Sequence, residues 1–294
     1  MSKNNSVTLF LMGEKGLSVL KALVPFKDQI VQVIGARDAN VQNDYYEDIQ
    51  CLCEKEKIHW IDKSKKPVID SAYSIAIAWR WLIPIEANNT LIILHDSLLP
   101  KYRGFAPLVN MLINHEPRIG VTALYANEEF DRGDIICQKS VCVEYPIRIE
   151  EAIEKVSKLY AEIVEDILGS LSKGNLIKAT KQEESEATYS LWRDEKDYNI
   201  DWSRDAEYIQ QFVYSLGYPF KGAATIINGQ TYRVLDCEVI EDIVIENRCA
   251  GKVMFMRNGL PVIVCGKGMI KITKMEDESG NAALPLKKYR TRYE

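Results

Sequence analysis

The 294-residue sequence predicts an α/β fold: a Rossmann-like domain with a mostly parallel sheet, followed by a small C-terminal β-rich, barrel-like domain. In the first half, short apolar runs alternate with stretches of helical periodicity, which is typical of βαβ units with helices covering the sheet. In the last third, Asn228-Gly229 and Asn258-Gly259 separate short apolar runs, as in β-hairpins. The 47% hydrophobic and 27% charged content is that of a globular protein and excludes disordered and collagen-like classes.

The elements of the first domain follow from the spacing of apolar residues. Continuous apolar runs of strand length are expected where both faces of a sheet are covered, and spacings of three and four indicate helices. The predicted strands are residues 7–12, 30–36, 58–60, 73–79, 90–95 and 121–125, and the predicted helices are 16–23, 45–56 and 106–114.

A long amphipathic helix is predicted to close the first domain. Its apolar residues recur every three or four positions: Ile149, Ala152, Ile153, Val156, Leu159, Tyr160, Ile163, Val164 and Ile167. Residues 170–187 are rich in Ser, Gly, Lys and Glu and indicate a linker. We therefore expect domains at residues 1–185 and 186–294. The second domain has a predicted helix at 205–215 and strands at 222–227, 232–240, 252–256, 260–264 and 269–274.

Charge and cysteine content restrict the class of protein. The net charge is −5, and from Arg193 onward 15 Lys and Arg residues balance 15 Asp and Glu residues, so no basic platform for nucleic acid is expected. Apolar runs fall short of the roughly 20 residues of a membrane span, and no cleavable signal pattern occurs, so we expect a cytoplasmic protein without a membrane partner. The seven cysteines are scattered, and Cys51 and Cys53 lack a second pair at zinc-ligand spacing. We expect neither a disulfide framework nor a bound metal.

His95 is the first candidate catalytic residue, because it ends a predicted buried strand. Catalytic side chains in parallel sheets lie at the carboxyl ends of strands. Asp131 lies in a later loop, and an acid and a base in one cleft favour proton transfer during attack on a carbonyl carbon. His59 and His115 have no comparable context, and we assign them no role.

The residues around His95 belong to an ordered set of motifs. In chain order they are Trp79-Arg80-Trp81-Leu82-Ile83-Pro84, His95-x-Ser97-Leu98-Leu99-Pro100-x-x-Arg103-Gly104, Gly120-Val121-Thr122, Asp131-x-Gly133-Asp134, Ile200-Asp201-Trp202 and Tyr218-Pro219-Phe220-Lys221-Gly222-Ala223. In this order and spacing the chain resembles the formyltransferase superfamily that uses 10-formyltetrahydrofolate.

The resemblance implies a folate-dependent formyltransferase whose catalytic residues are His95 and Asp131. It places the donor 10-formyltetrahydrofolate in a loop site and implies no metal. The residues expected to hold the folate are Trp81, Leu82, Ile83, Pro84, Asp131, Gly133 and Asp134. The residues expected to bind the second substrate are Ser97, Lys101, Tyr102, Arg103 and Gly104, and the basic ones suit a pyrophosphate.

One residue departs from the family pattern. The family has Asn two positions before the His, where the amide donates a hydrogen bond to the developing oxyanion, and this chain has Ile93. A hydrocarbon side chain cannot donate, and loss of one oxyanion donor costs roughly 3–4 kcal/mol in other enzymes. Asp96 would point to the other side of the strand and would repel an oxyanion. Ser97, a backbone amide of the next turn, and Asn88 or Asn89 are candidate replacements.

The acceptor implied most directly is the amine of a nucleotide-linked amino sugar, dTDP- or UDP-linked, for O-antigen, lipopolysaccharide or other surface glycan synthesis. The absence of basic excess favours it, and Trp79-Arg80 resembles the sugar-modifying branch, whose members suggest a homodimer. The turn Gly13 to Gly16 lacks the phosphate loop of the glycinamide ribonucleotide enzyme. Three alternatives stay open: methionyl-tRNA formyltransferase, a catalytically impaired binding protein with this fold, and a transferase of another acyl or one-carbon group.

Overall fold

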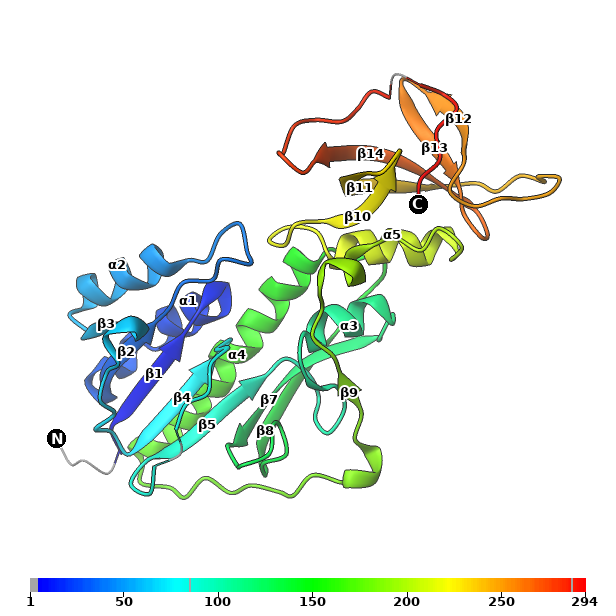
Figure 1. Cartoon of the computed structure of the whole chain (residues 1–294). Coiled ribbons are helices and arrows are strands. Elements are labelled where there is room, and N and C mark those ends of the chain that lie inside the picture. Colours follow the sequence, from blue (N-terminus) through cyan, green and yellow to red (C-terminus); the bar gives the residue numbers. More distant parts are fainter. Residues whose placement is uncertain (1–4, 85, 287) are drawn as a thin grey trace.

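The first domain is built on one seven-stranded sheet with the strand order β3-β2-β1-β4-β5-β7-β8. The computed structural model describes residues 5–84, 86–286 and 288–294 (Figure 1). β1 to β5 run parallel, whereas β7 is antiparallel to both β5 and β8, which confirms the predicted mostly parallel sheet. The strands are β1 (Val7–Leu11), β2 (Ile30–Gly35), β3 (Trp60–Asp62), β4 (Tyr73–Ile77), β5 (Thr90–His95), β7 (Arg118–Tyr125) and β8 (Ile135–Cys142).

The helices pack on the main-core face of the sheet, whereas strand and loop residues form the smaller cluster on the other face, so the central strands are buried on both faces. Every residue of β1 is buried, as a near-continuous apolar run requires. In β5, Ile92 and Leu94 join the main core, whereas Leu91 and Ile93 belong to a smaller cluster on the other face. The helices are α1 (Gly13–Ala22), α2 (Tyr46–Glu56), α3 (Pro107–Ile113) and α4 (Ile149–Ser172), and α1 packs along α4. The predicted apolar face of α4 is buried.

The structure adds one strand to the predicted first-domain sheet and shifts the bounds of several predicted elements. No strand is predicted over β8, where Gln138, Lys139 and Ser140 interrupt the apolar residues; an edge strand needs little burial, and β8 is mostly half-exposed. The short strand expected at 58–60 lies instead at Trp60–Asp62. The first helix begins at Gly13 rather than at residue 16, directly after β1.

The second domain is a five-stranded antiparallel sheet with α5 (Ala206–Ser215) against it, as predicted. Its order is β10-β11-β14-β13-β12, with bounds Ala223–Ile227, Gln230–Ile240, Met269–Asp277, Leu260–Val264 and Val253–Arg257. The final residues close the sheet into a barrel-like shape, because Thr291 accepts from the Val253 amide at one edge and Glu294 from the Ile226 amide at the other.

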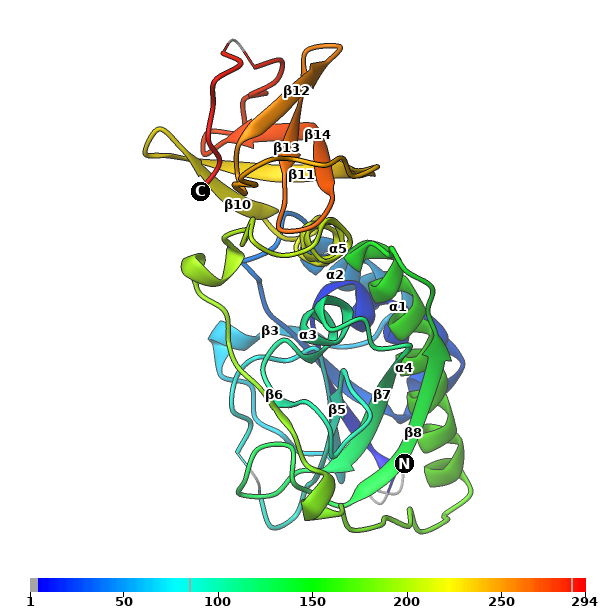
Figure 2. The same ribbon diagram turned by 90° about the vertical axis from the view of Figure 1, so that its right-hand side faces the viewer.

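The segment between the domains runs back over the first domain (Figure 2). It contains β9 (Tyr189–Ser190), which pairs in parallel with β6 (Arg103–Gly104), the last two residues of the His95 motif. The domains also meet where α5 packs on α3. Gln211 of α5 forms hydrogen bonds with both the backbone N–H and the carbonyl of Ile147.

Within the described ranges, no helix is long and apolar enough to cross a membrane. The same residues contain no group of three or more His, Cys, Asp or Glu side chains that could hold a metal ion. All seven cysteines are free thiols.

Candidate active site

His95 ends β5 at the carboxyl edge of the sheet and is buried. Its Nε2 atom lies 2.8 Å from the carbonyl oxygen of Tyr102. A carbonyl oxygen only accepts, so we assign the proton of the neutral ring to Nε2. The other ring nitrogen, Nδ1, lies 3.6 Å from Oδ1 of Asp131. Nδ1 can therefore accept a proton, and the resulting imidazolium would face a carboxylate.

Asp131 lies in the loop between β7 and β8, and the fold brings it beside His95. Its Oδ2 atom accepts a hydrogen bond of 2.8 Å from the backbone N–H of Gly104. Its φ angle of +57° is in the left-handed region, which Asp adopts more readily than most residues but at a cost. The carboxylate is thus fixed between two partners, and the backbone that carries it needs support.

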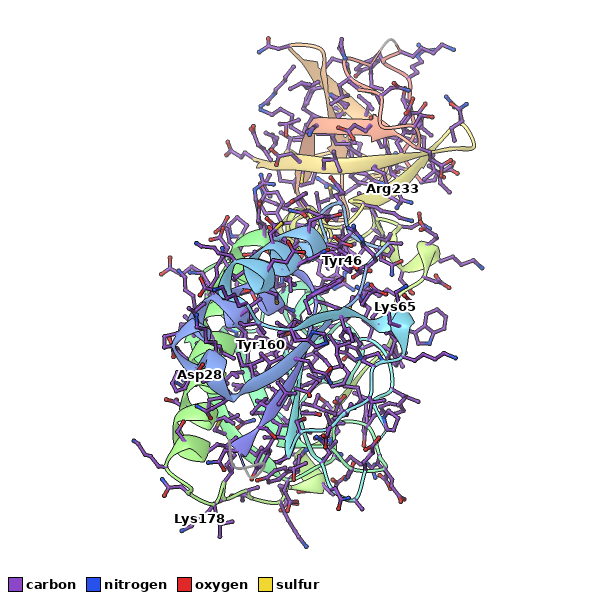
Figure 3. The ribbon with its side chains drawn as sticks, turned by 90° about the vertical axis from the view of Figure 1, so that its left-hand side faces the viewer. Asp28, Tyr46, Lys65, Tyr160, Lys178 and Arg233 are labelled. Atoms are coloured by element: carbon purple, nitrogen blue, oxygen red, sulfur yellow. The ribbon has the colours of Figure 1, made fainter. Side chains whose placement is uncertain are left out.

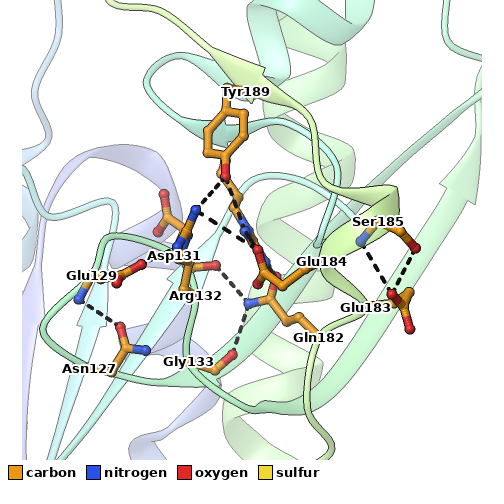
Figure 4. A network of polar contacts seen from close by, with 11 residues as sticks. Asn127, Glu129, Asp131, Arg132, Gly133, Gln182, Glu183, Glu184, Ser185 and Tyr189 are labelled. Carbon is orange, nitrogen blue, oxygen red and sulfur yellow. Dashed lines mark hydrogen bonds and ion pairs between the residues drawn. The ribbon is translucent and has the colours of Figure 1, made fainter.

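That support comes from Gly133 and from Gln182, which lies in the expected linker (Figure 4). A Cβ atom on Gly133 would lie 1.6 Å from the carbonyl oxygen of Tyr125, so only glycine fits there. The amide of Gln182 donates to the carbonyl oxygens of Asp131, at 2.7 Å, and Gly133, at 2.8 Å. No local sequence pattern predicts the role of Gln182, because its partners are backbone atoms about 50 positions away.

The loop expected to hold the folate follows β4 and presents an apolar surface. Trp81 packs edge-on against Trp79, and the ammonium of Lys63 lies 3.8 Å from its ring centre. Leu82 is 81% exposed, an unusual state for a large apolar side chain. Pro84 is also exposed, whereas Ile83 packs against the smaller cluster of β5.

The smaller cluster lies on the face of the sheet against which Ile83 packs. It comprises Phe10, Ile34, Ala76 and Leu91, with Ile83, Ile93 and Ala126 packed against it. Ala126 begins the loop that leads to Asp131, so both loops expected to bind folate border the same apolar surface. Ile93, at the position where the resemblance implies an Asn amide, is half-buried here.

The side chains suggested as replacements for that amide are engaged elsewhere. Ser97 is fully buried and donates to the carbonyl oxygen of Lys101 at 2.6 Å. Asn89 precedes β5, at the end opposite His95, and donates to the carbonyl of Ser71. Asn88 adjoins it and is exposed. Ser97 and Asn89 therefore have other partners, and Asn88 lies beside Asn89, so the backbone amide of the turn after His95 is the remaining candidate.

The residues expected to bind the second substrate fall into two groups. In the first group, Lys101 is exposed, the Tyr102 carbonyl contacts His95, and the Gly104 N–H donates to Asp131. Ser97 and Arg103 are instead buried, and Arg103 is only 1% exposed. The five N–H groups of Arg103 are occupied by Gln182, Glu184 and Tyr189. The structure therefore corrects the expectation that Arg103 meets a pyrophosphate, because burial and these partners withdraw its guanidinium.

A pocket of about 470 Å³ opens beside this region, and the sequence gives no sign of it. Its lining residues are Tyr102, Asn110, Asn114, Tyr189, Ser190, Leu191, Trp192, Arg193 and Asp197. Trp192 is 62% exposed, which leaves an aromatic face free. Tyr102 contributes both to the pocket wall and, through its carbonyl, to the position of His95.

Asp96 points away from His95, as expected, toward α1 and α4. It forms an ion pair with Lys15 and accepts a hydrogen bond of 2.6 Å from the hydroxyl of Tyr160, which is labelled inside the first domain in Figure 3. Burial alone would raise the pKa of Asp96, but Lys15 and Tyr160 outweigh it and hold the pKa below its usual value. Burial and the Asp96 charge raise the pKa of Tyr160, so its hydroxyl stays a donor.

Family models identify both domains. A model described as formyl transferase matches residues 72–168, and one described as formyl transferase, C-terminal domain, matches residues 193–289. The chain belongs to the formyltransferase superfamily. The first match contains His95 and Asp131, so the pair lies inside the conserved domain type of this superfamily rather than in an appended segment.

Individual relatives of this formyltransferase differ in substrate. The chain is 30% identical to the methionyl-tRNA formyltransferase of Caldanaerobacter subterraneus over 66% of its own length and 61% of the relative's. It is 28% identical to the methionyl-tRNA formyltransferase of Thermodesulfovibrio yellowstonii, over 94% of its own length and 92% of the relative's. The structure resembles that of WlaRD, a sugar 3N-formyltransferase in the presence of dTDP and 5-N-formyl-THF. The TM-score is 0.66 and the sequence identity is 17%, and the match covers 92% of this chain and 97% of WlaRD. The match to the Caldanaerobacter enzyme therefore spans about three fifths of that relative, and the likeness to WlaRD shows the fold.

Proposed function

We propose that this formyltransferase moves the formyl group of 10-formyltetrahydrofolate to the amine of a nucleotide-linked amino sugar. The observation that carries the proposal is the His95–Asp131 pair, placed at the carboxyl edge of the sheet beside a small pocket. WlaRD, whose structure holds dTDP and a formylated folate, supports both substrate classes.

His95 serves as the proton carrier in the proposed reaction. The neutral amine attacks the formyl carbon, the bond from that carbon to N10 of the folate breaks, and N10 leaves with a proton. Nδ1 of His95 takes the proton from the amine and passes it to N10, while Nε2–H stays on the Tyr102 carbonyl. At 3.6 Å, Asp131 attracts the imidazolium by roughly 4–5 kcal/mol at an effective dielectric constant near 20. Asp131→Asn should therefore lower kcat at least about 100-fold.

The loops around the smaller cluster suit the donor. A pterin ring is flat and largely apolar on its faces, and the smaller cluster packs against Ile83 of the Trp81 to Pro84 loop and against Ala126, which begins the loop that leads to Asp131. We propose that these loops hold the folate, with backbone groups recognising its polar edge. The folate supplies the activated formyl group, and the chain supplies position and the proton carrier.

The pocket beside Tyr102 suits a small acceptor. Ligand sites commonly enclose about 300–1,000 Å³ with a few polar groups among apolar ones, and a nucleotide sugar falls within that range. Trp192 and Tyr189 offer exposed rings on which a pyrimidine base could stack, and Arg193 lies in the same wall. We propose that the base occupies this pocket and directs the sugar amine toward His95.

A second candidate is methionyl-tRNA formylation, because the two sequence relatives carry that name. Binding tRNA requires clustered Lys and Arg to neutralise phosphates, with strong salt dependence. Acidic and basic residues balance from Arg193 onward, and the chain is net negative. This charge pattern favours the nucleotide sugar.

The test is mass spectrometry of products after incubation with 10-formyltetrahydrofolate. One arm offers dTDP- and UDP-linked amino sugars, and the other offers methionyl-tRNA. We expect a gain of one formyl group on a nucleotide sugar, lost in His95→Ala and in the near-isosteric His95→Asn. Formylation of methionyl-tRNA alone would support the second candidate. No formylated product in either arm would contradict both.

A further inference from the structure

We infer that Gln182 is a positioning residue, which holds Asp131 beside His95 by joining the Asp131 loop to the buried Arg103. The effect on kcat rests on the proposed function, whereas the effect on the position of the Asp131 loop does not. No motif contains Gln182, and it lies between the two matched family regions.

Every polar atom of the Gln182 side chain has a partner that bears on the site. The Nε2 group donates to the carbonyls of Asp131 and Gly133, which fixes the backbone on both sides of Arg132. The Oε1 atom accepts from Arg103, at 3.1 Å from Nε and 2.7 Å from Nη2. The amide therefore cannot be inverted or removed without leaving donors or acceptors unpaired.

Arg103 gives Gln182 a fixed anchor. Its guanidinium forms a two-pronged ion pair with Glu184, at 2.7 Å and 2.9 Å, in addition to the contact with Gln182. The next residue, Gly104, donates its N–H to the Asp131 carboxylate. Arg103 and Gly104 thus reach Asp131 by two routes, one to its backbone through Gln182 and one to its side chain.

The Asp131 loop needs such a restraint. Its φ of +57° is unfavourable for a non-glycine residue and persists only when surrounding contacts enforce it. The tip of the loop is open to solvent, with Phe130 74% exposed. Outside Gln182, Arg132 links the loop to Tyr189 and Glu184 through exposed side chains, and such pairs hold weakly.

Gln182→Glu tests the inference with the least change in shape. One carboxylate oxygen keeps the contact with Arg103, but the other is an acceptor where Nε2 donated to two carbonyls, so the bonds to Asp131 and Gly133 are lost. Because a displacement of about 1 Å costs roughly 100-fold in other enzymes, we expect kcat to fall 10- to 100-fold. KM for either substrate should change less than about twofold, since Gln182 is assigned no substrate contact.

Glu183→Gln is the matched control, because among the described residues its carboxylate bonds only to Ser185 in the same segment. The double variant Gln182→Glu with Glu183→Gln restores the net charge and should keep the full kcat loss. If the charge introduced by Glu impairs folding, Gln182→Met replaces that variant in the test, since Met is uncharged and of similar length. It should also lower kcat. Thermal unfolding of each variant reports whether the chain is folded.

Hydrogen exchange at the Gly104 amide gives a readout that does not depend on activity. This N–H bonds to the Asp131 carboxylate, so release of the loop should speed its exchange at least about tenfold in Gln182→Glu but not in Glu183→Gln. Unchanged exchange and kcat in a folded Gln182→Glu would overturn the inference. Faster exchange in a protein without formyl transfer would retain it and refute only the proposed function.

Discussion

Replacing Asp96 with Asn removes one charge from the cluster on the far side of β5 from the smaller apolar cluster. The carboxylate of Asp96 binds both Lys15 of α1 and Tyr160 of α4. These contacts tie two helices to the residue that follows His95. The substitution keeps the shape of the side chain, so its effect reports on the charge.

The magnitude follows from burial. Removing one partner of a buried ion pair costs about 3–5 kcal/mol, because the other charge stays uncompensated. Lys15 and Asp96 side chains are 14% and 16% exposed, so the Lys15 ammonium can reach some water. We therefore expect a loss near the lower end, about 3 kcal/mol. For a domain of this size that lowers Tm by roughly 6–12 °C.

Calorimetric unfolding of the wild type, Asp96→Asn, Lys15→Met and the double variant measures this loss and the coupling of the pair. The folded-state pKa of Asp96 lies below its unfolded value, so its contribution is present above about pH 3.9 and disappears as the pH falls below that value. The difference between wild type and Asp96→Asn should shrink accordingly. A loss under 1 kcal/mol at pH 7, or one independent of pH down to 3, would refute the reasoning.

Three further substitutions test other parts of the structure. Gly133→Ala should lower kcat more than about 100-fold, because the new Cβ meets the Tyr125 carbonyl, whereas Gly169→Ala, with open space around it, should match wild type in the same assay. Ile93→Asn should not raise kcat in steady-state kinetics, because a backbone donor is the remaining candidate for the oxyanion; a rise of about tenfold or more would mean that the wild-type site lacks a donor. Tyr293→Ala should cost about 3–5 kcal/mol in denaturant unfolding, because the ring is 2% exposed; a loss under 1 kcal/mol would contradict its place in the core.

Much of the fold could be predicted because its signals are local. The apolar run of β5 and the repeat along α4 specify burial within a few residues of sequence. β8 could not be predicted, because a half-exposed edge strand shows little apolar pattern and forms by pairing with β7.

The candidate site divides in the same way. His95 and Asp131 could be proposed from a strand end and a motif, and the fold brings them together. The burial of Ser97 and Arg103 depends on contacts with distant segments, which no local pattern specifies. The contacts of Gln182 could not be predicted for the same reason. Its neighbours in sequence have the composition of a linker, and its side chain donates to carbonyls of another loop.

The most direct test follows the ¹³C label of 10-[¹³C]formyltetrahydrofolate by NMR in one reaction mixture. It asks whether the formyl group reaches the sugar amine and whether His95 is needed for the transfer. We predict a labelled formamide on the nucleotide-linked amino sugar with the wild-type chain, and its loss by at least about 100-fold in His95→Asn. A labelled sugar formed at the wild-type rate by the folded His95→Asn variant would contradict the assignment of His95 as the proton carrier.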